Sequence, residues 1–280
     1  MAITGGVKFF DNNKILFSKG ASAAASSGDI VSDYAIDRNP SSYWISVGSD
    51  DTTAETLEIT FPNGAQTIDR LFILDHNLKD FKIEWDNASV WTAFSNVLGI
   101  DGTKSGIVET TFGENTCYYE FDAVTTSKIK ITMNKTQVVD AEKYINQVIA
   151  TEELGTLQGF PEISSVDSDR NERKKKMLSG KMLVIKSEES FSTKLSFKKY
   201  PALYSSDLDL MVDLFEKETN FLVWLCGGKY GSNNFRYALR GFRLQDLKTV
   251  QMIKAFKVKY DKNIYINGVN FSVNFEEVVD

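Results

Sequence analysis

Histidine and cysteine are scarce in this chain of 280 residues, which contains one histidine and two cysteines. The single histidine, His76, excludes any multi-histidine metal site and leaves little basis for a histidine-dependent catalytic centre. Cys117 and Cys226 lie 109 residues apart and show neither a CxxC pattern nor a metal-ligand spacing. Both are therefore expected to be buried free thiols, as in a protein that folds in a reducing cytoplasm.

Long apolar runs and a recognisable targeting segment are also missing. No run approaches the roughly 20 apolar residues that a bilayer-spanning helix needs, so no membrane span is predicted. Residues 1–14, MAITGGVKFFDNNK, lack a basic region followed by an apolar one, so no secretory signal is expected. Hydrophobic residues make up 42% of the chain and charged residues 25%, which is typical of folded soluble protein.

Sequence motifs of catalysis are absent. The chain has no G-x-S-x-G, HExxH, P-loop or G-x-G-x-x-G pattern. Acidic pairs such as Glu188 and Glu189 are adjacent, and in a strand they would face opposite sides. We therefore expect a protein that is not an enzyme, although a glycosidase built from carboxylates far apart in the sequence remains open.

Charge is divided unevenly along the chain, whose formal net charge is -6. Residues 1–150 carry 12 basic and 20 acidic side chains, and residues 151–280 carry 20 and 18. Neither half has the basic excess of a nucleic-acid-binding domain. Residues 170–176 include five basic side chains interrupted by Glu172, which we interpret as a solvated linker, with a site for phosphate or an acidic partner as the alternative.

The N-terminal half alternates apolar and polar residues in short segments separated by Gly-, Asn-, Asp- and Ser-rich stretches. This rhythm predicts antiparallel strands and a β-sandwich over residues 1–154. The expected strands are 57–61, 68–74, 81–85, 117–121, 127–133 and 145–151.

Residues 155–175 lose this rhythm and predict a linker, followed by a second β-rich domain with one helix over residues 176–280. The helix is expected at 205–220, with Leu208, Met211, Val212 and Phe215 on one face covering a sheet. Leu210 and Leu214 widen that apolar face beyond what one sheet needs. They are therefore predicted to contact a neighbouring subunit.

The segment AIDRNPSSYWIS (35–46) carries a pattern formed by Ala35, Asp37, Asn39, Ser42 and Trp44. It resembles a loop of discoidin-type, galactose-binding-like domains, and the later strands of the half follow that family in order. Arg38 stands where the family has glycine, and Ser42 where it has threonine. The resemblance implies a jelly-roll sandwich for this half.

The same resemblance suggests roles for three loop residues. It implies that Trp44 packs in the core and that Asp37 and Ser42 are candidate calcium ligands. A further family carboxylate falls on Gln147, which removes one negative charge from such a site. The expected cofactor is therefore none or calcium, and Asp37 capping its own turn is the alternative.

The segment LDHNL (74–78) resembles a strand-to-loop turn of discoidin-like domains in bacteriophage tail proteins. His76, Asn77 and Trp91 are candidate glycan contacts, because an aromatic face stacks on a sugar while imidazole and amide groups bind its hydroxyls. The alternatives are that His76 only ties the turn and that Trp91 belongs to the core.

The C-terminal half resembles, in its pattern of elements, the fold of phage tail-tube, tail-terminator and distal tail proteins. The resemblance implies a homo-oligomer, with six subunits in a ring, that uses sheet edges as interfaces. The leading hypothesis is a structural component of a phage or phage-like tail or baseplate. Such a protein would be assembled in the host cytoplasm, contact other tail proteins in the virion and display its sandwich towards a host-surface glycan. The competing hypothesis is a carbohydrate-binding-module protein outside any virion.

Overall fold

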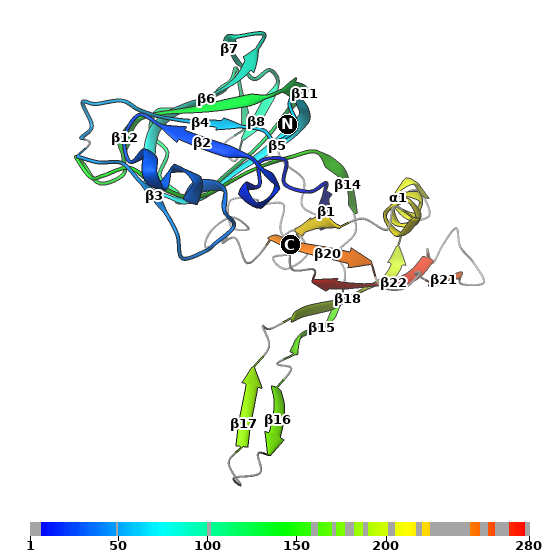
Figure 1. Cartoon of the computed structure of the whole chain (residues 1–280). Coiled ribbons are helices and arrows are strands. Elements are labelled where there is room, and N and C mark those ends of the chain that lie inside the picture. The colour runs from blue at the N-terminus through cyan, green and yellow to red at the C-terminus, as the bar shows by residue number, and fades with distance from the viewer. Residues whose placement is uncertain are drawn as a thin grey trace.

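The computed structural model is mostly β, with several antiparallel sheets and one short α-helix in the described part of the chain, which confirms the predicted fold class (Figure 1). No helix in the described part is long and apolar enough to cross a membrane. The structure describes residues 7–48, 50–99, 102–157, 162–169, 172–176, 182–186, 190–200, 205–216, 220–224, 247–252, 257–260 and 269–277. Cys226 lies outside these ranges, so the expectation for its thiol is not addressed.

Two antiparallel six-stranded sheets form the N-terminal sandwich. Sheet B has the order β10-β6-β12-β4-β2 with β7 paired to β6, and sheet C has the order β3-β13-β5-β11-β8-β9. The strands of sheet B are β2 (Ser22–Ala25), β4 (Glu55–Thr60), β6 (Leu78–Asn87), β7 (Val90–Ala93), β10 (Ile107–Glu109) and β12 (Lys128–Thr136). Those of sheet C are β3 (Trp44–Ile45), β5 (Gln66–His76), β8 (Val97–Gly99), β9 (Gly102–Lys104), β11 (Cys117–Thr126) and β13 (Tyr144–Thr151).

The sandwich core lies between sheets B and C and follows from the alternation of the strands. In β4, for example, Leu57 and Ile59 are fully buried while Glu58 between them is partly exposed. Trp44 is also fully buried, as expected, and its Nε1 donates to the carbonyl oxygen of Ser27 at 3.2 Å. The short 3-10 helices η1 (Phe17–Lys19) and η2 (Asp29–Ile36) precede β2 and β3 along the chain.

A third sheet, sheet A, has eight strands in the order β14-β1-β19-β20-β22-β18-β15, with β21 paired to β22. Its strands are β1 (Val7–Phe10), β14 (Glu153–Leu157), β15 (Glu162–Asp169), β18 (Ser190–Tyr200), β19 (Phe221–Trp224), β20 (Leu247–Met252), β21 (Lys257–Tyr260) and β22 (Val269–Glu277). A separate hairpin of β16 (Glu172–Lys176) and β17 (Met182–Lys186) projects away from the sandwich beyond β15 and β18 (Figure 1).

The range 155–175, expected to be a linker, carries strands instead. It includes most of β14, all of β15 and most of β16. In addition β1, near the start of the chain, pairs on one side with β14 and on the other with β19. The N-terminal segment therefore belongs by hydrogen bonding to sheet A and not to the sandwich.

An aromatic layer joins β1 and β19 to the outer face of sheet C. Phe72 of β5 and Tyr118 of β11 are opposite each other in register, and their ring centroids lie 4.5 Å apart. Phe10 packs against Phe72 at 5.4 Å, and Trp224 packs against Tyr118 at 5.3 Å. All four side chains are at most 1% exposed. Sheet C is thus buried on both faces here, between the sandwich core and sheet A.

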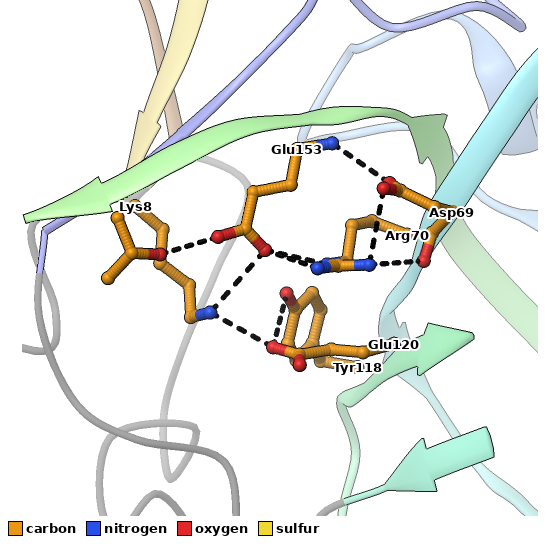
Figure 2. Close-up of polar contacts among 7 residues, drawn as sticks. Lys8, Asp69, Arg70, Tyr118, Glu120 and Glu153 are labelled. Carbon is orange, nitrogen blue, oxygen red and sulfur yellow. Dashed lines mark hydrogen bonds and ion pairs between the residues drawn. The ribbon is translucent and has the colours of Figure 1, made fainter. Parts of the chain in front are cut away.

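Charged residues border this aromatic layer (Figure 2). The Nε of Arg70 donates to Glu153 at 2.8 Å, and the Nζ of Lys8 lies 2.9 Å from Glu120. The backbone N–H of Glu153 donates to Asp69 at 2.8 Å. We call these five residues, Lys8, Asp69, Arg70, Glu120 and Glu153, the junction network. It connects β1, β5, β11 and β14.

Burial and charge act in opposite directions on the carboxylates of the junction network. Burial raises the pKa of Glu153, but nearby Lys8 and Arg70 outweigh it, and the pKa is lowered overall. For Asp69 burial prevails over the attraction of Arg70, and its pKa is raised. Removing one cation would therefore leave buried carboxylates poorly compensated.

The helix α1 (Ser205–Glu216) confirms the predicted helix, but its buried face differs from the expected one. Val212, expected to cover a sheet, is 39% exposed, whereas Met211 is fully buried and Leu214 is 3% exposed. Leu210 lies so close to β14 that a Cβ added to Gly155 would collide with it. Leu210 and Leu214, predicted to meet a neighbouring subunit, therefore pack within the chain. The reason is that the helix contacts β14, most of which lies in the predicted linker.

We expect Arg70→Met to lower the free energy of unfolding by about 3 kcal/mol, because it leaves three carboxylates with Lys8 alone. Urea denaturation would measure the change. The matched control is Lys82→Met, since the side chain of Lys82 is 44% exposed and pairs with Glu84 at 3.1 Å. That variant should stay within about 0.5 kcal/mol of the parent. Equal effects of the two substitutions would contradict a stabilising role for the junction network.

We also expect limited trypsin digestion to cut the projecting hairpin at Arg173–Lys176 without separating the two products. The pairing of β1 with β19 and the packing of Trp224 on Tyr118 hold the fragments together. They should separate on a denaturing gel and elute as one species in native size-exclusion chromatography. Two separate native peaks would instead show that the halves are independent.

Candidate functional site

One end of the sandwich gathers loops from both sheets. At this end β5 finishes at His76, β12 finishes at Thr136, and β6, β11 and β13 begin. The loops 46–53 and 137–143 are tied together there, because the buried Lys143 donates from its Nζ to the carbonyl oxygens of Asp50 at 2.7 Å and Thr53 at 3.0 Å. We call this region the loop end.

His76 is fully buried at the loop end. Its Nδ1 accepts from the backbone N–H of Leu78 at 3.1 Å, and its ring stacks on Phe112 at 5.6 Å. Burial lowers its pKa to about 3, so the imidazole is neutral at physiological pH. As folded, His76 is out of reach of a glycan, and this placement matches the alternative that it ties the turn.

Asn77 uses its side chain to hold the start of β13. Its Nδ2 donates to the carbonyl oxygen of Glu142 at 2.7 Å, and its Oδ1 accepts from the N–H of Tyr144 at 3.0 Å. These two bonds fix the backbone on which the Tyr144 side chain stands. The structure therefore gives Asn77 a positioning role at the loop end.

Asp75, the residue before His76, is partly exposed, as Asn77 is. It adopts a φ of +46°, in the left-handed region that Asp tolerates better than most residues. Its Oδ2 accepts from the hydroxyl of Tyr43 at 2.7 Å. The backbone N–H of the next residue donates to the carbonyl oxygen of Asn115 at 2.9 Å, which anchors this unusual turn.

Tyr43 and Tyr144 form an aromatic pair beside Asp75. Their ring centroids are 5.7 Å apart and their planes are inclined at 83°. Both side chains are partly exposed, and burial together with the charge of Asp75 raises the pKa of Tyr144. We call Tyr43, Asp75 and Tyr144 the Tyr–Asp cluster. It combines apolar ring faces, phenolic hydroxyls and one carboxylate at one surface position.

Trp91 lies at the opposite end of the sandwich. It sits on β7 opposite Asp86 of β6, whereas Asn77 directly precedes the first residue of β6. At about 3.4 Å per residue the two ends of this strand are roughly 30 Å apart. Trp91 is partly exposed and the Nζ of Lys130 lies 4.2 Å from its ring centroid. One small glycan therefore cannot contact Asn77 and Trp91 together.

The structure brings Asp37 and Ser42 together, as the resemblance implied. The Oγ of Ser42 donates to Asp37 Oδ2 at 2.7 Å, and the N–H of Asn39 donates to Asp37 Oδ1 at 2.8 Å. Asn146 donates to the carbonyl oxygens of Ser42 at 2.6 Å and of Asn39 at 3.4 Å. Gln147 is fully buried and donates to the carbonyl oxygen of Ala35 at 2.7 Å. These bonds fasten the loop to β13.

The oxygens of this loop are engaged in hydrogen bonds within the loop and to β13, and calcium binding stays a prediction. Both carboxylate oxygens of Asp37 already accept hydrogen bonds, whereas calcium takes six to eight oxygen ligands. The geometry instead matches a carboxylate that caps its own turn.

Two comparisons gave no relative: no family model matches the chain, and no curated protein matches it. Among solved structures, the N-terminal half is similar to chitosan-binding module 1 of a chitosanase/glucanase from Paenibacillus sp. IK-5 (15% identity, TM-score 0.39). That match covers 50% of this chain and 98% of the module. The family 32 carbohydrate-binding module of C. perfringens NanJ, solved with galactose, is 21% identical over 52% of this chain and 99% of the module, with a TM-score of 0.39. These similarities are too distant to carry an argument about function.

We expect calcium to leave the thermal stability of this chain unchanged, because the loop of Asp37 satisfies its oxygens internally. Melting temperatures in millimolar calcium and in EDTA should agree. Asp37→Ala should lower the free energy of unfolding by about 1 kcal/mol equally in both solutions, through the lost hydrogen bonds. A melting temperature that rises with calcium in the parent and not in Asp37→Ala would show that the loop rearranges to bind the ion.

Proposed function

We propose that the chain binds a glycan through the Tyr–Asp cluster at the loop end of its sandwich. The observation that carries the proposal is the pairing of two partly exposed tyrosine rings with a carboxylate held at hydrogen-bond distance. The C–H faces of a sugar ring stack on aromatic rings, and its hydroxyls donate to carboxylates. A carboxylate that accepts one hydrogen bond from Tyr43 retains capacity for more donors.

The cluster is held in place before any ligand arrives, which supports this role. Tyr144 is fixed through the bond of its N–H to Asn77, and Asp75 through the turn that His76 anchors. A preordered site loses less conformational entropy on binding. The proposed role is non-catalytic: Tyr43, Asp75 and Tyr144 contact the sugar and do not transfer protons or groups.

For the whole chain, we propose a structural role in a phage or phage-like tail or baseplate, as a homo-oligomer within the virion. Its support is the form of sheet A, which ends at β14 and β15 and carries the projecting β16–β17 hairpin. Open sheet edges favour pairing with another chain, and a two-stranded hairpin is marginally stable without further packing. The sixfold ring and the other tail proteins as partners belong to the same proposal. A carbohydrate-binding protein outside any virion is the alternative, and a stable monomer would favour it.

Glycan binding should weaken by about tenfold or more in Tyr144→Ala and in Asp75→Ala, since each removes one sugar contact. An array of galactose-, N-acetylgalactosamine- and glucosamine-terminated glycans would identify a ligand, and isothermal titration would measure its affinity. Trp91→Ala is the matched control, because it removes an aromatic ring at the opposite end of the sandwich. Melting temperatures would confirm that each variant is folded.

Two outcomes would contradict the proposal. Absence of binding by the parent chain across the array would exclude glycan recognition of these kinds. Binding that survives both loop-end substitutions and is lost in Trp91→Ala would instead place the glycan on the β6–β7 hairpin.

A further inference from the structure

Exposed β-branched residues gather on two adjacent loops of the loop end. Val138 and Val139 are 69% and 73% exposed, and Val47 is 71% exposed. The loops that carry them are joined, because the N–H of Ser46 donates to the carbonyl oxygen of Lys143 at 2.9 Å. Exposed apolar patches bounded by polar residues commonly mark contact surfaces. We give the name valine tip to these three valines together with the carboxylates of Asp50, Asp51, Asp140 and Glu142.

The valine tip carries four carboxylates, those of Asp50, Asp51, Asp140 and Glu142. None of them forms an ion pair within 4.0 Å in the described part of the chain. Hydrogen bonds from threonines lower the pKa of Asp50 and of Asp51, so both stay charged at physiological pH. Lys143, whose Nζ donates to the carbonyl oxygens of Asp50 and Thr53, is buried. An apolar centre with an acidic border suits a partner that is apolar and basic.

The β16–β17 hairpin has this composition. In sequence, β16 contains four consecutive basic residues, Arg173 to Lys176, and β17 contains four consecutive apolar residues, Met182 to Ile185. The two runs are paired residue by residue, from Arg173 opposite Ile185 to Lys176 opposite Met182. A two-stranded hairpin gains stability when a further surface packs on it.

The hairpin and the valine tip of one chain do not meet, since the hairpin projects beyond sheet A on the side away from the sandwich (Figure 1). We propose that the valine tip binds the β16–β17 hairpin of a second copy of this chain. In this register each face of the hairpin combines two basic with two apolar positions, for example those of Lys175 and Leu183. In the proposed contact these positions meet the acidic border and the valines of the tip. A lipid surface suits this tip less well, because the four carboxylates are repelled by anionic headgroups.

The contact joins two different surfaces, so it is a heterologous interface. Such an interface repeats from copy to copy and gives a ring when the rotation closes, or a filament when it does not. The inference does not depend on the Tyr–Asp cluster. A chain that binds no glycan would assemble in the same way.

Charge exchange between the two surfaces tests the proposal in the full-length chain. Sedimentation velocity over a concentration series would give the association constant of the parent. Lys175→Glu and Glu142→Lys should each weaken association by about tenfold or more, and the double variant should regain much of the loss, because the pair is restored with reversed charges. Val138→Ser with Val139→Ser should also weaken it, while Lys19→Glu, an exposed reversal on η1, should not.

Three outcomes would overturn the inference. A parent chain that remains monomeric at all concentrations has no such interface. Loss of association in Lys175→Glu without rescue by Glu142→Lys places the hairpin on another surface. Monomeric parent chain that floats with neutral phosphatidylcholine vesicles, and stops floating when the two valines become serine, identifies lipid as the occupant of the valine tip.

Discussion

Burial of sheet C on both faces is the constraint on which the rest of the structure depends. Its inner face packs in the sandwich core, and its outer face presents Phe72 and Tyr118 to Phe10 and Trp224. Each such aromatic side chain removes about 150–250 Å² from water, so this layer contributes most of the stability at the junction. The ion pairs of the junction network contribute less net stability, since desolvation offsets much of their attraction. Their bonds instead fix the position of β14 and β1 over the sheet.

Three consecutive residues at the end of β5 show how a rigid scaffold presents a surface group. His76 is buried, Asn77 is engaged with the backbone at the start of β13, and Asp75 is left beside Tyr43. The strained turn at Asp75 persists because its neighbours determine it on both sides. The position of the surface carboxylate is therefore set by the buried His76 and by the backbone bonds of Asn77.

Strand alternation was a sound guide to the sandwich, because each strand has one face in the core and period-two patterns report that directly. The segment YWI already indicates that Tyr43 points away from the core if Trp44 points into it. The sequence could not show that residues 7–10 would leave the sandwich for β19, since that pairing depends on a contact between residues more than 200 positions apart. A second long-range contact, between α1 and β14, explains the helix. Met211 and Leu214 are buried on a helix that packs on β14, and the composition of the sequence predicts a linker at most of that strand.

The position of β1 between β14 and β19 affects the order in which the chain can fold as it is made. Sheets B and C are complete once Thr151 has been synthesised, yet one edge of β1 lacks its partner until Trp224 follows. At about 5–20 residues per second, roughly 3–13 s separate β14 from β19 on the ribosome. During this interval Phe10, Phe72 and Tyr118 have no Trp224 to cover them. The nascent chain thus passes through a stage in which the outer face of sheet C lacks part of its apolar cover. At this stage a chaperone that binds apolar surfaces would find its largest binding surface.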